Sequence, residues 1–262
     1  MTTHRLQIVR RLLPDFGTTY GPVGDRPLPA VMLLHGSEGG LSGWSHRNAV
    51  MLAAHGFLAF PMPYSIGGNT WNAGSIQNVE LMNSVRAMRA LRSFEFCNGS
   101  VGLFGVSRGG EHALLVTSLM VRDGLDDLPD AVAVHSAADT ICGAFDARAY
   151  RDIGDEGFRP WDPSKRAWTW NGSSEDLLPT TPIAIEAYPG PIFLTHGDSD
   201  AVWSVDTTRR LEQRLVDAGR APETHYFAGE GHSLRSEAEN RFNELLLDFL
   251  DRSLSDRNEY AA

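Results

Sequence analysis

The sequence is poor in cysteine and has no stretch suited to a membrane or a nucleic acid. Its two cysteines, Cys97 and Cys142, are too few for a disulfide framework or a thiolate metal site, so we expect two reduced thiols. No run approaches the ~20 apolar residues of a membrane span, and residues 1–11 lack the apolar region of a signal peptide. The formal net charge is -10 without any cluster of basic residues, which argues against nucleic-acid and anionic-membrane partners. These absences predict a cytoplasmic location.

Two further absences concern cofactors. The glycine-rich stretch at residues 35–40 contains neither the Gly-Lys-Ser/Thr of a phosphate-binding loop nor a Gly-x-Gly-x-x-Gly pattern, which disfavours nucleotide binding. His196, Asp198 and Asp200 resemble part of a metal cluster, but no second dense group of histidines and acidic residues accompanies them. We therefore expect neither a metal nor another cofactor.

Short apolar runs alternate with amphipathic segments along the chain. With 262 residues and 42% hydrophobic content, the chain can bury a large core in one domain. The alternation predicts an α/β fold, with a mostly parallel central sheet and helices on both faces. Residues 6–13 begin an expected edge hairpin. Strands are expected near residues 29–34, 56–64 (with an exit loop), 101–106, 131–135, 191–195 and 224–227, and helices near residues 44–55, 75–92, 109–121, 205–218 and 237–254.

A Gly-x-Ser-x-Gly turn joins the strand at Val101 to an apolar helix. A serine at such a strand-to-helix turn is held in a strained conformation with its hydroxyl exposed, and Gly105 and Gly109 are small enough to permit the turn. The helix N-terminus beside it favours a developing oxyanion. Ser107 is therefore the candidate nucleophile.

An acid and a histidine follow Ser107 in chain order. Asp200 comes after the strand near residues 191–195 in a Gly-x-x-Asp turn, where a carboxylate could hold the tautomer of a histidine and stabilise its charged form. Asp198 is the near alternative and Asp139 a more distant one. His232, directly after the turn glycines Gly229 and Gly231 that follow the last strand, is the candidate general base. The order nucleophile, acid, base separates one class of serine hydrolases from the others.

More than fifty residues separate the strands near residues 131–135 and 191–195. Because structureless connections of this length are rare in compact domains, we expect a cap or lid insertion at about residues 139–189. The segment is rich in aromatic residues, and Trp161, Trp168 and Trp170 are the candidates for substrate binding.

These motifs resemble the α/β-hydrolase superfamily. The resemblance rests on His35-Gly36, the residues from Gly105 to Gly109, Gly197-x-x-Asp200 and Gly231-His232, and spans nearly the whole chain. More narrowly, residues 101–115 and 200–204 are similar to dienelactone-hydrolase-like proteins and to the catalytic domain of the acyl-CoA thioesterase and bile-acid acyltransferase family. The dienelactone hydrolases and acyltransferases use cysteine where this chain has Ser107, and the thioesterases carry an N-terminal β-sandwich domain that this sequence does not contain.

The resemblance implies a mechanism without a cofactor. Ser107 would attack a small-molecule ester or thioester with help from His232, form an acyl-enzyme and release it to water, while the backbone N–H groups of Ser37 and Arg108 hold the oxyanion. Two other classes of function remain open: an acyltransferase or lyase on the same fold, and a binding or receptor module without catalysis. The sequence does not indicate an oligomeric state.

Overall fold

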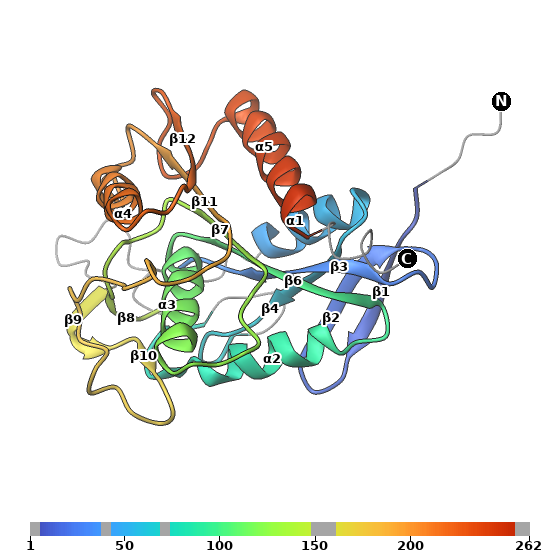
Figure 1. The fold of residues 1–262 in the computed structure, drawn as a ribbon, viewed down its shortest axis with the longest axis horizontal. Helices are drawn as coiled ribbons and strands as arrows, with labels where there is room; N and C mark the ends of the chain where they lie inside the picture. The colour runs from blue at the N-terminus through green and yellow to red at the C-terminus, as the bar shows by residue number, and fades with distance from the viewer. Residues whose placement is uncertain (1–5, 38–42, 69–73, 148–160, 255–262) are drawn as a thin grey trace.

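The computed structural model has an eight-stranded central sheet with helices on both faces (Figure 1). It describes residues 6–37, 43–68, 74–147 and 161–254. In order across the sheet, the strands are β1 (Ile8–Leu13), β2 (Gly17–Pro22), β4 (Leu58–Met62), β3 (Leu28–Leu34), β6 (Cys97–Val106), β7 (Ala131–His135), β11 (Ile192–Gly197) and β12 (Glu223–Phe227). The six strands from β4 to β12 pair in parallel with one another, whereas β2 pairs antiparallel with β4, so the predicted α/β fold with a mostly parallel sheet is confirmed. The predicted edge hairpin is also present, because β1 and β2 pair antiparallel at one edge.

Within the described ranges, five helices cover the sheet: α1 (Gly43–Ala54), α2 (Met82–Arg92), α3 (Arg108–Arg122), α4 (Asp206–Asp217) and α5 (Ser236–Leu254). They form two layers, which follow from the pleat of the strands. In β3, Val31 and Leu33 belong to the apolar cluster under α1 and α5, whereas Met32 and Leu34 belong to the cluster under α2 and α3. None of the helices in the described ranges is long and apolar enough to cross a membrane.

The helix α2 is shorter than the sequence pattern predicts. A helix was expected to begin near residue 75, but α2 begins at Met82, because Val79 and Glu80 form a short strand, β5 (Val79–Glu80). This strand pairs in parallel with β10 (Trp168–Thr169) from a distant part of the chain. The Glu80 carboxylate accepts the backbone N–H of Met82 at 3.1 Å, which supports the later helix start.

The expected insertion contains little regular structure in its described parts. Besides β10, it holds β8 (Gly143–Phe145) and β9 (Trp161–Arg166), which pair antiparallel in a small separate sheet. Residues 148–160 lie outside the described residues. Side chains such as Phe145 and Ile183 belong to the same apolar cluster as α2 and α3. The described parts of the segment therefore pack on the body of the domain, and a lid function stays a prediction.

Candidate active site

Ser107 lies at the sharp turn between β6 and α3. It has φ 56° and ψ -122°, which are strained values for a residue with a side chain. The flanking glycines are sterically required: a Cβ on Gly105 would lie 2.1 Å from the carbonyl oxygen of Gly109, and a Cβ on Gly109 would lie 1.9 Å from that of Leu34. The backbone N–H of Ser107 donates to the His135 carbonyl at 2.9 Å. The turn thus fixes Ser107 at the N-terminus of α3.

Asp200 and His232 meet at the same edge of the sheet, beyond the ends of β11 and β12. Nδ1 of His232 lies 2.7 Å from Oδ2 of Asp200. The other carboxylate oxygen, Oδ1, accepts the backbone N–H groups of Val202 at 2.7 Å and Trp203 at 3.0 Å. This arrangement leaves Nε2 of His232 as the nitrogen that can exchange a proton with a substrate or nucleophile.

The carboxylate of Asp200 is held in its charged form. Burial alone would raise its pKa, but the hydrogen bonds from His196, His232 and the Val202 N–H outweigh burial and hold the pKa of Asp200 well below its usual range. The Asp200 side chain is fully buried, whereas that of His232 is 22% exposed. A buried negative charge next to a partly exposed imidazole is suited to stabilising that imidazole when it takes up a proton.

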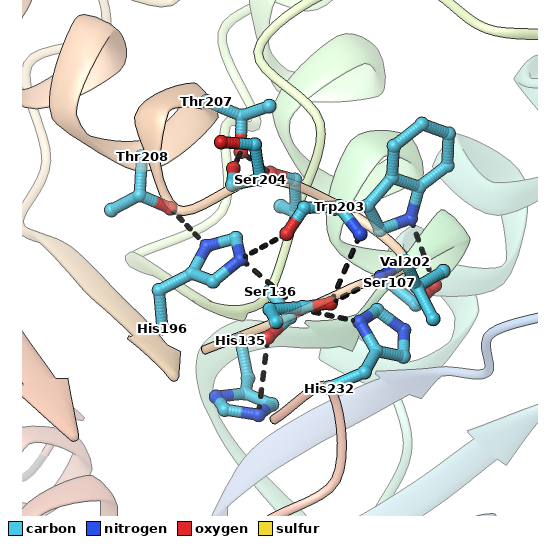
Figure 2. Close-up of polar contacts among 12 residues, drawn as sticks. Ser107, His135, Ser136, His196, Val202, Trp203, Ser204, Thr207, Thr208 and His232 are labelled. Atoms are coloured by element: carbon cyan, nitrogen blue, oxygen red, sulfur yellow. Dashed lines mark hydrogen bonds and ion pairs between the residues drawn. The ribbon is translucent and has the colours of Figure 1, made fainter. Parts of the chain in front are cut away.

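Ser107 and His232 line one cavity of about 460 Å³. The indole N–H of Trp203, from the loop after β11, donates to Oγ of Ser107 at 3.3 Å (Figure 2). The other described residues that line the cavity come from α1 and α5, from the ends of β6 and β7, from the first residue of β9 and from the loops after β3, β11 and β12. They are Ser37, Trp44, Arg47, Asn48, Val106, His135, Trp161, Val202, Ser233, Leu234, Glu239 and Phe242. Side chains from widely separated segments therefore converge on the candidate nucleophile.

His135 also lines this cavity but is a poor candidate for a general base. Burial lowers its pKa to about 3, and the nearby imidazoles of His196 and His232 act in the same direction. Both of its ring nitrogens have hydroxyl partners, Thr195 Oγ1 at 2.9 Å and Ser136 Oγ at 3.3 Å. His232, which bonds to a carboxylate, is the better placed histidine.

The carboxylates of the two alternative acids, Asp198 and Asp139, bond to residues other than His232. Oδ1 of Asp198 accepts the backbone N–H of Gly229 at 2.7 Å and therefore connects the loops after β11 and β12. Asp139 forms two hydrogen bonds with the guanidinium of Arg210, at 3.0 Å and 2.7 Å. In the described structure the carboxylate bonded to His232 is that of Asp200.

The two candidate oxyanion donors come from different segments of the chain. Ser37 follows β3 and lines the cavity with Ser107. Arg108 is the first residue of α3, a position whose backbone N–H has no acceptor within the helix. The Arg108 side chain is fully buried, with Nε 3.2 Å from Oε2 of Glu111, so only its backbone is available to a substrate.

The three candidate tryptophans have different environments, and two of them differ from the expectation. Trp161 lines the cavity, and its ring centroid lies 6.3 Å from that of Trp203. Trp168 is fully buried and donates its indole N–H to Oε1 of Glu111 at 2.7 Å. Trp170 donates to Oδ2 of Asp123, just beyond the end of α3, at 2.6 Å. Among the described residues that line the cavity, only Trp161 of the three is present, because burial and hydrogen bonding hold the other two in the body of the domain.

The sequence was compared with models of known protein families. The model of the prolyl oligopeptidase family matches residues 74–257, which is more than half of the chain and includes the Ser107 turn, Asp200 and His232. The chain belongs to the prolyl oligopeptidase family. This membership supports a serine hydrolase and agrees with the α/β-hydrolase resemblance of the motifs. No curated protein sequence matches the chain.

Solved structures with the same fold include both esterases and peptidases. A proposed dienelactone hydrolase of Klebsiella pneumoniae is 15% identical with a TM-score of 0.62, covering 95% of this chain and 100% of its own. Esterase 2 of Thermogutta terrifontis, phosphorylated by paraoxon, is 14% identical with a TM-score of 0.62, covering 94% of each chain. A puromycin-hydrolyzing peptidase of Mycobacterium tuberculosis is 17% identical with a TM-score of 0.64, covering 95% of this chain but 39% of its own. Sequence identities this low show only that this member of the prolyl oligopeptidase family has the same fold as these proteins.

Two side chains near Ser107 were not assigned to the site from the sequence. Trp203 donates to Oγ of Ser107, and His196 contacts Asp200, with Nε2 3.1 Å from Oδ2. His196 and Asp200 are four residues apart in a stretch where the sequence predicts Asp200 as the acid but considers His196 only as part of a metal cluster. The short spacing of His196 and Asp200 could have indicated a contact between them. Whether the two side chains point toward each other, however, depends on the conformation of the loop after β11.

Proposed function

We propose that this protein is a serine hydrolase that cleaves carboxylic esters through an acyl-enzyme, with Ser107 as nucleophile, His232 as general base and Asp200 as the acid that orients His232. The observation that carries the proposal is the 2.7 Å contact between His232 and Asp200 at the cavity that holds Ser107. The strained turn at Ser107 supports the same assignment, because such a turn places a nucleophile at a helix N-terminus, and Ser107 lines the cavity there.

In the first half of the reaction, Oγ of Ser107 bonds to the carbonyl carbon of the ester while its proton passes to Nε2 of His232. The bond from that carbon to the alcohol oxygen then breaks, and His232 returns the proton to the departing alcohol. The negative charge on the carbonyl oxygen would be held by the backbone N–H groups of Arg108 and Ser37.

In the second half, water takes the place of the alcohol. It gives a proton to His232 and bonds to the acyl carbon, the bond to Oγ of Ser107 breaks, and His232 returns the proton to Ser107. The products are a carboxylic acid and an alcohol. Asp200 keeps its negative charge throughout, because the depressed pKa of its carboxyl opposes protonation.

The cavity supports an ester with an apolar acyl or alcohol group. Trp44, Leu234 and Phe242 supply apolar surface, and Trp161 and Val202 supply more from other segments. Polar side chains such as Arg47, Asn48 and Glu239 line the same cavity, and apolar walls combined with placed polar groups are typical of small-molecule sites. A thioester would fit the same chemistry, with a thiol as the leaving group.

A second candidate is hydrolysis of a peptide or amide bond. The match to the prolyl oligopeptidase family favours it, and so does the fold shared with a puromycin-hydrolyzing peptidase. The nucleophile, base and acid would be the same, and His232 would protonate an amine instead of an alcohol.

One panel of substrates tests both candidates. It contains p-nitrophenyl esters and acyl-CoA thioesters of graded acyl length, together with aminoacyl p-nitroanilides. We expect the highest kcat/KM for an ester and a loss of at least about 10⁴-fold in Ser107→Ala. The exposed Ser164→Ala is the matched control and should keep wild-type rates.

A fluorophosphonate probe gives an independent measurement. It should label the wild-type protein at Ser107, as located by peptide mass spectrometry, and should not label Ser107→Ala. Activity retained in Ser107→Ala would contradict the nucleophile, and faster turnover of the anilides than of the esters would favour the peptidase. If an added alcohol captured the acyl group in preference to water, acyl transfer would replace hydrolysis.

A further inference from the structure

A second imidazole lies on the carboxylate of Asp200. His196, the penultimate residue of β11, is fully buried, and its Nε2 lies 3.1 Å from Oδ2, the same oxygen that contacts His232. Nε2 of His196 also lies 3.0 Å from the carbonyl oxygen of Trp203, and Nδ1 lies 2.8 Å from Oγ1 of Thr208 on α4. Figure 2 shows the His196 ring between Thr208 and Trp203, on the far side of the site from His232.

The partners of His196 determine where its proton sits. Nε2 contacts a carboxylate oxygen and a carbonyl oxygen, both of which only accept hydrogen bonds, so Nε2 must carry a hydrogen. Nδ1 contacts a hydroxyl, which can donate, so the neutral imidazole accepts at Nδ1 from Thr208. The neutral Nε2–H tautomer therefore fits the partners of the ring, with its one Nε2 hydrogen shared between the Trp203 carbonyl and the Asp200 carboxylate.

This contact completes the set of donors around Asp200. Oδ1 accepts the two backbone N–H groups of Val202 and Trp203, and Oδ2 lies between His196 and His232. A carboxylate with defined donors on both oxygens has little freedom to rotate. His196 also bonds to the backbone carbonyl of Trp203, the residue whose indole N–H donates to Ser107. It therefore helps to fix the loop that carries Trp203.

We propose that His196 is a positioning residue for catalysis: from the side opposite His232, it holds the carboxylate of Asp200 in the orientation that His232 requires, and Thr208 fixes the tautomer in which it does so. The inference rests on the proposed function, since it assigns a role beside Asp200 in the same reaction. His196 itself contacts no substrate, because its side chain is fully buried.

The main test compares His196→Gln with His196→Met. The two new side chains have nearly the same shape, but only glutamine has an N–H donor near the position of Nε2. We expect His196→Met to lower kcat for the best p-nitrophenyl ester on the order of 10- to 100-fold with KM changed less than about twofold, since a small displacement of a catalytic group has a cost of this size. His196→Gln should recover most of that loss.

A second pair of variants tests the tautomer of His196 without changing His196 itself. Thr208→Val removes the hydroxyl that donates to Nδ1, and we expect a loss in kcat of about threefold to tenfold without a change in KM. Thr207→Val is the matched control on the same helix, because the Thr207 hydroxyl donates to the carbonyl oxygens of Ala137 and Ser204 and does not contact His196. It should keep the wild-type kcat even if it lowers the melting temperature.

The outcomes separate this inference from the proposed function. If His196→Met and Thr208→Val keep the wild-type kcat while Ser107→Ala is inactive, His196 has no positioning role and the serine hydrolase stands. The same conclusion follows if Gln and Met at residue 196 lose kcat equally in folded proteins, as judged by circular dichroism. If Ser107→Ala remains active, the proposed function itself fails.

Discussion

Nδ1 of His232 lies 2.7 Å from Oδ2 of Asp200, which joins two loops whose residues are 32 positions apart in sequence. We expect Asp200→Asn to lower kcat on the order of 10⁴-fold, because an amide in this position stabilises the wrong tautomer of the histidine. Asp198→Asn and Asp139→Asn should keep kcat within about tenfold, since these carboxylates bond to Gly229 and Arg210. Measuring kcat for ester hydrolysis on the three purified variants provides the comparison. A larger loss of kcat in Asp198→Asn than in Asp200→Asn would assign the role of the acid to Asp198.

The glycine at residue 109 should be essential for both stability and activity. In Gly109→Ala the new Cβ would lie 1.9 Å from the carbonyl oxygen of Leu34 and 2.5 Å from that of His35, so β3 and the loop after it must move. We expect a loss of about 3 kcal/mol in the free energy of unfolding and a large fall in kcat. Chemical denaturation measures the first and ester turnover the second.

Gly43→Ala is the control for this substitution. Gly43 is the first residue of α1, and an added Cβ there meets no heavy atom within 4 Å. This variant should be neutral or more stable by up to about 1 kcal/mol, as expected for alanine in a helix. Equal effects of the two substitutions would mean that the turn around Ser107 relaxes more easily than its geometry suggests.

The ion pair between Arg108 and Glu111 lies in the first turn of α3 and is fully buried. Glu111 also accepts the indole N–H of Trp168 and the backbone N–H of Cys142, both at 2.7 Å. Glu111→Ala would leave a buried guanidinium without its counter-charge, so we expect a loss of about 3 to 5 kcal/mol in unfolding free energy. The exposed pair of Arg241 and Glu244 has the same sequence spacing, and Glu244→Ala should cost less than about 1 kcal/mol.

Urea denaturation of both variants under the same conditions provides the measurement. A loss below about 1 kcal/mol in Glu111→Ala would show that the buried pair is dispensable. Because Arg108 is also a candidate oxyanion donor through its backbone, kcat measured well below the melting temperature would show whether the pair also positions that N–H group.

Features that depend on short sequence motifs could be predicted from the sequence, whereas features that depend on contacts between distant segments could not. Ser107 could be placed at a strand-to-helix turn because the turn needs small residues on both sides, a requirement that is visible in five consecutive letters. Asp200 and His232 could be expected at one edge of the sheet because parallel strands bring their carboxyl ends together there. Their catalytic roles stay a prediction. These inferences need only the order of the elements along the chain.

The roles of the tryptophans could not be read from the sequence. Trp168 is buried because β10 pairs with β5, two strands of two residues each that lie far apart in the chain. The same pairing shortens α2, since it removes Val79 from an otherwise helical apolar pattern. Composition identifies aromatic residues in a segment, but their burial depends on contacts of this kind.

Three buried histidines should make the protein less stable in mild acid. Burial lowers the pKa of His35 to about 4, that of His112 to about 3 and that of His135 to about 3, compared with 6.5 for an exposed imidazole. Between pH 6.5 and 4 the unfolded chain therefore binds more protons than the folded protein. The stability is fully present above about pH 6.5 and is lost as the pH falls, by up to about 1.4 kcal/mol per pH unit for each histidine.

His112→Leu tests one of these contributions. The slope of unfolding free energy against pH should fall by about one proton between pH 6.5 and 4, whatever the stability of the variant at pH 8. The exposed His55→Leu is the control and should keep the wild-type slope. Urea denaturation at a series of pH values gives the slopes, and an unchanged slope in His112→Leu would mean that His112 becomes protonated in the folded protein.

Trp161 should affect substrate choice, whereas Trp170 should affect stability. Trp161 lines the cavity beside Trp203, the residue whose indole donates to Ser107. Removing its ring would take away roughly 1 to 2 kcal/mol of apolar contact with a long acyl or alcohol group but little from a short one. We therefore expect Trp161→Ala to change the ratio of kcat/KM for long and short p-nitrophenyl esters by about tenfold.

Trp170 is 6% exposed and bonds to Asp123 at the end of α3 distant from Ser107, so Trp170→Ala should lose about 3 to 5 kcal/mol in stability and keep the wild-type ratio. If Trp161→Ala keeps that ratio across a size-graded panel, the variable part of the substrate lies against another wall of the cavity, such as the one formed by Trp44 and Phe242.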